Sequence, residues 1–154
     1  SRQSLQVQIP AGIDDGKSIR LKGKGNPGFG SGAAGDLLLK VHVADKPGFT
    51  RNGMDVETTV NIPFTTAVCG GEVPVRTLDG TVLCKIREGT QSGSRIRLKG
   101  KGIVSMKTPS VHGDLYVKVQ IQVPTSVSPQ ARQKLREFEE AMKASSPYGN
   151  AGAA

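Results

Sequence analysis

The sequence predicts a mainly β fold in which a duplicated unit of strands is followed by one short C-terminal helix. The chain has 20 glycines and 9 prolines, which indicate many turns, and it has no tryptophan. With only 2 tyrosines and 4 phenylalanines, a core must come from Val, Ile and Leu, which favour strands. The motif IRLKGKG occurs twice, and apolar residues at helical spacing are found only near the C-terminus.

The duplication extends well beyond this motif. Its two copies, Ile19–Gly25 and Ile96–Gly102, lie 77 residues apart. Downstream, one inserted residue raises the spacing to 78, and GDLLLKVHV (35–43) faces GDLYVKVQI (113–121). Upstream, the original spacing pairs Ile9 with Ile86, Gly12 with Gly89, and Gly16 with Gly93.

Each copy is predicted to hold three strands. In the first copy they are LQVQI (5–9), IRLKG (19–23) and GDLLLKVHV (35–43), separated by a Gly-x-x-x-Gly loop and a glycine-rich loop. Apolar residues alternate along these segments, so one face of each strand is expected to lie in a core.

Residues 54–81 precede the second copy and have no counterpart before the first. They predict a strand (DVETTVNIPF), a short turn or helix (TTAVCGG) and another strand (EVPVRTL), with hairpin turns at Asn52-Gly53 and Asp79-Gly80. We therefore expect the first unit to be truncated, which would leave an open sheet edge available for pairing.

The C-terminal segment changes to a helical period. Ser128 suits the N-cap and Pro129 the first helical position. An apolar stripe follows at Ala131, Leu135, Phe138 and Met142. The expected segments are the truncated first unit (1–52), the second unit (53–125), the helix (126–143) and a flexible tail (144–154).

Charge and cysteine content narrow the function classes. The net charge of +8 favours acidic partners but does not choose among nucleic acid, acidic peptides and anionic membranes. Cys69 and Cys84 are the only cysteines and form no C-x-x-C pair, so a thiolate zinc site made by this chain alone is not expected. Both are predicted to be buried free thiols, with a disulfide as the alternative. The chain contains no apolar run of 18 residues and no signal peptide, which favours a cytoplasmic protein.

No catalytic arrangement is apparent. The segment GIDDGKS (12–18) is one residue short of a phosphate-binding loop and leads into a strand instead of a helix. Asp36 and Asp114 begin equivalent strands, which favours turn capping over paired-carboxylate catalysis. His42 and His112 have no acid–base partners in the pattern. An enzyme is therefore not predicted.

Two kinds of binding remain open. Nucleic acid could use the basic residues of the two motif copies, but single-strand binding normally adds aromatic side chains, and the motif copies contain none. Peptide binding needs an accessible strand edge and apolar pockets, which the predicted strands supply. The basic residues in question are Arg20, Lys22, Lys24, Arg97, Lys99 and Lys101.

Four segments in order, IPAGIDDGKSIRLKGKGNPG, GDLLLKVHVADKPGFTRNGMDVE, VNIPFTTAVCGGEVPVRTLDG and GDLYVKVQI, resemble the C-terminal peptide-binding region of the DnaJ family of J-domain co-chaperones. The resemblance covers nearly all of residues 3 to 143. It implies two tandem β-sandwich domains, the first of them partial here, followed by a helical dimerisation segment.

The resemblance also implies roles for individual residues. Client peptide would bind Leu5 and Leu39, with Val7 and Leu37 as neighbours; the alternative is that Leu5 and Leu39 belong only to a core. Phe64 would be a hinge between domains. Dimerisation would use Leu135, Phe138 and Met142, and packing of this helix on the second domain is the alternative.

For the whole protein, the resemblance implies delivery of unfolded clients to a DnaK-type ATPase chaperone through a J-domain that is absent from this sequence. Many members also carry a zinc domain inserted in the first β domain. No cofactor is expected for this chain itself, because no C-x-x-C motif is present.

Overall fold

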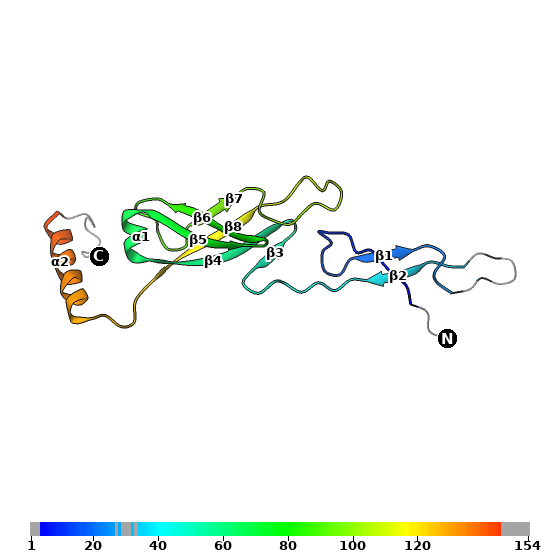
Figure 1. Ribbon diagram of the computed structural model, residues 1–154, viewed down its shortest axis with the longest axis horizontal. Helices are drawn as coiled ribbons and strands as arrows, with labels where there is room; N and C mark the ends of the chain where they lie inside the picture. Colours follow the sequence, from blue (N-terminus) through cyan, green and yellow to red (C-terminus); the bar gives the residue numbers. More distant parts are fainter. Residues whose placement is uncertain (1–3, 27, 29–31, 33, 146–154) are drawn as a thin grey trace, which may run out of the picture. The chain divides into compact units, whose positions relative to one another are not determined.

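A computed structural model describes residues 4–26, 28, 32 and 34–145 of the chain. It divides into two compact units, Ser1–Ile121 and Gln122–Ala154. Among the described residues, the strands and one short helix lie in Ser1–Ile121, except that the last strand ends at Gln122, and the C-terminal helix lies in Gln122–Ala154 (Figure 1).

The first copy of the repeat forms a small antiparallel sheet. Strand β1 (Ser18–Leu21) pairs with β2 (Leu37–Lys40), so that Ile19 faces Leu39 and Leu21 faces Leu37. Apolar residues at every second position lie on the same face of a pleated sheet. This register therefore places all four of these side chains on one face.

The second copy is part of a larger sandwich. The strands β3 (Thr50–Asn52), β4 (Asp55–Pro63), β8 (Leu115–Gln122) and β7 (Arg95–Leu98) form a sheet in that order. Helix α1 (Phe64–Cys69) connects β4 to a hairpin made of β5 (Gly71–Thr77) and β6 (Gly80–Ile86).

The hairpin and the four-stranded sheet share one apolar core. Its most buried side chains are Val56 and Ile62 from β4, Ile86 from β6, and Leu115, Val117 and Val119 from β8. Burial of a large aliphatic side chain contributes about 1.5–3 kcal/mol, which makes this core the main source of stability in the β sandwich. The mainly β fold with a short C-terminal helix is thus confirmed.

The predicted strand over residues 5–9 is wrong, because no strand is found between residues 4 and 17. Its equivalent in the second copy, β6, is held by its hairpin partner β5. No described segment offers such a partner to residues 5–9, and alternation alone does not make a strand without one. The third predicted strand, 35–43, is also shorter and spans only Leu37–Lys40.

Cysteine burial was predicted correctly for one residue and wrongly for the other. Both thiols are free, but only Cys84 is buried, since Cys69 lies exposed in the last turn of α1. Burial raises the pKa of the Cys84 thiol.

Helix α2 spans Pro129–Ser145, two residues beyond the predicted end. Ser128 caps it as expected, because the Ala131 N–H donates to the Ser128 Oγ at 3.1 Å. None of the helical residues is fully buried. The predicted flexible tail lies almost entirely outside the described residues.

Candidate functional site

One face of the β1–β2 sheet is apolar and only half buried. Ile19, Leu21, Leu37 and Leu39 each retain intermediate exposure, whereas Leu38 on the opposite face is 60% exposed. Among the described residues, β1 and β2 pair only with each other. Each strand therefore has an outer edge without a strand partner, beside a partly exposed apolar face.

The two copies share several backbone hydrogen bonds at equivalent positions. In the first, the Gly16 N–H donates to Val41 O at 2.8 Å, and in the second the Gly93 N–H donates to Val119 O at 2.7 Å. The next loop is closed in each copy by a 2.8 Å bond between equivalent glycines, Gly25 to Gly35 and Gly102 to Gly113. The repeat found in the sequence is therefore a structural repeat as well.

Asp36 and Asp114 act as the predicted turn caps. Asp36 Oδ1 accepts the Gly23 N–H at 3.1 Å, and Asp114 Oδ1 accepts the Gly100 N–H at 2.9 Å. Asp114 Oδ2 also accepts from Arg97 Nε at 2.7 Å. The Gly100 N–H first, and then the Arg97 guanidinium, lower the pKa of the Asp114 carboxyl. These carboxylates have structural partners in both copies.

The repeat spacing shows what each predicted peptide-binding residue corresponds to in the second copy. Leu37 and Leu39 correspond to Leu115 and Val117, which are fully buried. Leu5 and Val7 correspond to Val82 and Cys84 of β6. All four equivalents belong to, or pack against, the core cluster of the β sandwich.

The four predicted peptide-binding residues are less closely associated than their equivalents in the second copy. Leu37 and Leu39 lie together on the apolar face of β2. Leu5 and Val7 belong to the segment that forms no strand, where Leu5 is 43% exposed. The structure thus brings two of the predicted residues together in one sheet and leaves the other two on a separate segment.

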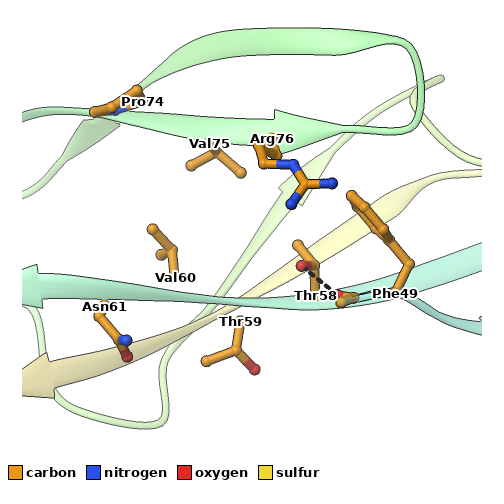
Figure 2. A pocket seen from close by; sticks show the side chains of 9 residues that line it. Phe49, Thr58, Thr59, Val60, Asn61, Pro74, Val75 and Arg76 are labelled. Carbon is orange, nitrogen blue, oxygen red and sulfur yellow. Dashed lines mark hydrogen bonds between the residues drawn. The ribbon is translucent and has the colours of Figure 1, made fainter. Parts of the chain in front are cut away.

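A cavity in the β sandwich was not predicted from the sequence. It has a volume of about 280 Å³ and lies between the edges of β4 and β5 (Figure 2). Figure 2 shows Val60 and Val75 on opposite sides of it, with the Phe49 ring at one end. Its volume is just below the usual range of small-molecule sites.

Two cations flank Phe49 beside this cavity. Lys46 Nζ lies 5.6 Å and the Arg76 guanidinium 5.7 Å from the centre of the ring. Such cation–π contacts fix the ring and keep positive charge at the cavity rim. The sequence contains little signal for this cavity. A single phenylalanine between a glycine and a threonine is just as typical of an ordinary core residue as of a residue that lines a site.

The contacts of Arg51 were also not predicted from the sequence. Its side chain is only 16% exposed and reaches across the first unit to the loop around Ile13. The sequence RNG indicated a hairpin turn but gave no reason to expect a long-range contact.

The predicted dimerisation and hinge residues lie in separate parts of the chain. Leu135 is 52% exposed on α2, while Phe138 and Met142 are half buried. Phe64 is the first residue of α1, between β4 and β5, and is 40% exposed.

Two further classes of site, metal centres and membrane-spanning helices, are not found among the described residues. They contain no group of three or more His, Cys, Asp or Glu side chains that could hold a metal ion. Neither α1 nor α2 combines the length and apolar character that a membrane span requires.

Comparison with known proteins identifies the family. The family described as DnaJ C terminal domain matches residues 1–124. Chaperone protein DnaJ of Burkholderia thailandensis is 46% identical over 145 residues, 94% of this chain and 38% of that protein. Chaperone protein DnaJ of Lachnospira eligens is 40% identical over 149 residues, 97% of this chain and 40% of that protein. The chain thus spans about two fifths of the length of these relatives. It belongs to the DnaJ family, in which it represents the C-terminal domain region.

Proposed function

We propose that this protein is a non-enzymatic co-chaperone component that binds unfolded client polypeptides and dimerises through α2. In the cytoplasm, the whole protein would deliver these clients to a DnaK-type ATPase chaperone. Family membership and the relatives named chaperone protein DnaJ support this proposal. It rests mainly on the half-buried apolar face of β1–β2, whose equivalents in the second copy form a closed core.

Client binding would proceed by strand addition. An extended client segment can pair its backbone with an open strand edge while alternate side chains enter an apolar site. Leu37 and Leu39 supply the apolar face beside the open edge of β2, and Leu5 and Val7 extend the set. Because backbone pairing is independent of sequence, this mode suits a protein that must accept many different clients.

Dimerisation would use the apolar stripe of α2. Leu135, Phe138 and Met142 follow one another at helical spacing, and a symmetric pair of such helices can bury the stripe of each against the other. A dimer presents two client sites on one particle, which raises avidity for a long unfolded chain.

The test compares two adjacent leucines on opposite faces of β2. Leu39→Ala removes the apolar side chain proposed to contact client, and its matched control Leu38→Ala removes an equally large side chain from the other face. Binding of a reduced, alkylated and permanently unfolded polypeptide is measured by fluorescence anisotropy. Leu39→Ala should weaken binding by about tenfold, the effect of losing a large part of one leucine burial.

Leu5→Ala provides a second variant that does not alter a strand, because Leu5 lies outside the β1–β2 sheet. It too should weaken binding, with its circular dichroism spectrum unchanged. The proposal would be rejected if Leu38→Ala weakened binding as much as Leu39→Ala and Leu5→Ala. Tight, strongly salt-dependent oligonucleotide binding that these changes leave intact would favour a nucleic-acid-binding β domain instead.

A further inference from the structure

The loop Gly12–Asp14 of the first copy is attached to residues that follow that copy in the chain. Arg51 Nη2 donates to Gly12 O at 2.6 Å and Nη1 donates to Ile13 O at 2.9 Å. The same guanidinium lies 3.6 Å from Asp14 Oδ1 and donates to Gly53 O, at the turn between β3 and β4. One side chain therefore connects the loop of the first copy to the β3–β4 hairpin.

The loop also packs tightly against a second segment. Gly12 has φ +87°, and a side chain added there would overlap the carbonyl oxygen of Val104. Ile13 is only 7% exposed, whereas its equivalent Thr90 is a polar residue of intermediate exposure. The loop is thus held by hydrogen bonds on one side and by close packing on another.

The equivalent loop of the second copy is held differently. There the Gly89 and Thr90 N–H groups donate to Ala67 O of α1, at 2.9 and 3.0 Å. Arg97 and Asp114 pair within their own copy, as do Arg20 and Asp36. The Arg51 contacts therefore have no equivalent within either copy. They run from the first copy to the β3–β4 hairpin.

We infer that Gly12, Ile13, Asp14, Arg51 and Val104 form a repeat junction that holds the first copy in a fixed orientation to the second. Arg51 is the positioning residue of this junction. Its planar fork reaches two successive carbonyl oxygens and a carboxylate at once, a pattern that a lysine ammonium cannot reproduce. Since most of the Arg51 side chain is buried, these bonds are less exposed to competition from water than surface pairs are. The inference does not depend on client binding.

The junction can be tested by measuring distances across it in the full chain. Spin labels are placed at Lys40→Cys on β2 and Lys85→Cys on β6, which are both exposed, in a Cys69→Ser background that removes the exposed native thiol. Pulsed electron resonance then gives the distribution of distances between the two copies. An intact junction predicts a single narrow distribution.

Two variants remove the junction from opposite sides. Arg51→Ala deletes the hydrogen bonds, and Gly12→Ala forces the loop away from Val104. Each should broaden the distribution at least twofold, and Arg51→Lys should not restore it. Gly89→Ala is the matched control for Gly12→Ala, because Gly89 is its repeat equivalent with φ +79° but has no atom within 4 Å of an added side chain. Arg87→Ala, on an exposed arginine, is the control for Arg51→Ala.

If Arg51→Ala unfolds the β sandwich, as judged by circular dichroism, the Gly12→Ala variant tests the junction instead, because Gly12 lies in the first copy. A parent distribution that is already broad would overturn the inference. So would Gly12→Ala and Gly89→Ala distributions of equal width.

Discussion

At the residue scale, individual side chains fix the loops of this protein, and equivalent side chains do so in both copies of the repeat. Asp114 illustrates this, because its carboxylate accepts both the Gly100 N–H and the Arg97 guanidinium, and its pKa is lowered as a result. A carboxyl whose pKa is lower in the folded state stabilises that state above its unfolded pKa of about 3.9, and this contribution is lost as pH falls through the folded value.

Asp114→Asn should therefore lower stability at neutral pH, because the amide keeps an acceptor but loses the charge. The midpoints of urea unfolding for the parent and the variant should converge in acid as Asp114 of the parent becomes protonated. Unfolding measured from pH 7 to pH 2.5 tests this expectation. A difference that stays constant over the whole range would show that the charge of Asp114 contributes nothing.

The two thiols should differ sharply in reactivity. Cys69 is exposed, whereas Cys84 is buried and its thiol pKa is raised, so little reactive thiolate forms there. A disulfide reagent at pH 8 should label one thiol per native chain rapidly and the second only at the rate of unfolding. Mass spectrometry assigns the fast site, and rapid labelling of both in native protein would contradict the buried position of Cys84.

At the scale of elements, the sequence was informative where a strand has its partner within the chain. The alternation in DVETTVNIP and EVPVRT, together with the Asn52-Gly53 turn signal, predicted β4, β5 and their hairpins correctly. The same alternation in LQVQI failed, because a strand depends on backbone bonds to a neighbour that a local pattern does not supply. The start of α2 was predicted from its cap, since capping is a local interaction.

Helix α2 depends strongly on that cap, because no residue within it is fully buried. Ser128→Ala should cost about 1 kcal/mol of helix stability, whereas Ser128→Asp should retain most of it because aspartate is also a good cap. Helical ellipticity at 222 nm measures the effect, and Ser126→Ala, two residues before the cap, is the control. Equal ellipticity for Ser128→Ala and Ser126→Ala would mean that other contacts hold the helix.

At the scale of the whole molecule, the repeat made the site partly predictable. Leu37 and Leu39 could be placed on one face because alternation fixes the sides of a strand, and the structure has them there. The Arg51 contacts and the cavity beside Phe49 could not be predicted, because they join residues that no shared pattern connects. Long-range contacts between unlike segments leave no periodic signal in a single sequence.

The apolar stripe of α2 predicts that the protein dimerises through this helix. In a symmetric dimer each stripe residue contributes one contact from each of the two helices, so one substitution removes two contacts. Leu135→Ala should weaken the dimer by a factor of about 10 or more, given the usual burial energy of leucine. Sedimentation equilibrium over a range of concentrations measures the dissociation constant. Gln133→Ala, which changes the same helix away from the stripe, should leave it unchanged. A parent chain that stays monomeric at high micromolar concentration, or equal weakening by both substitutions, would exclude the stripe as the dimer contact.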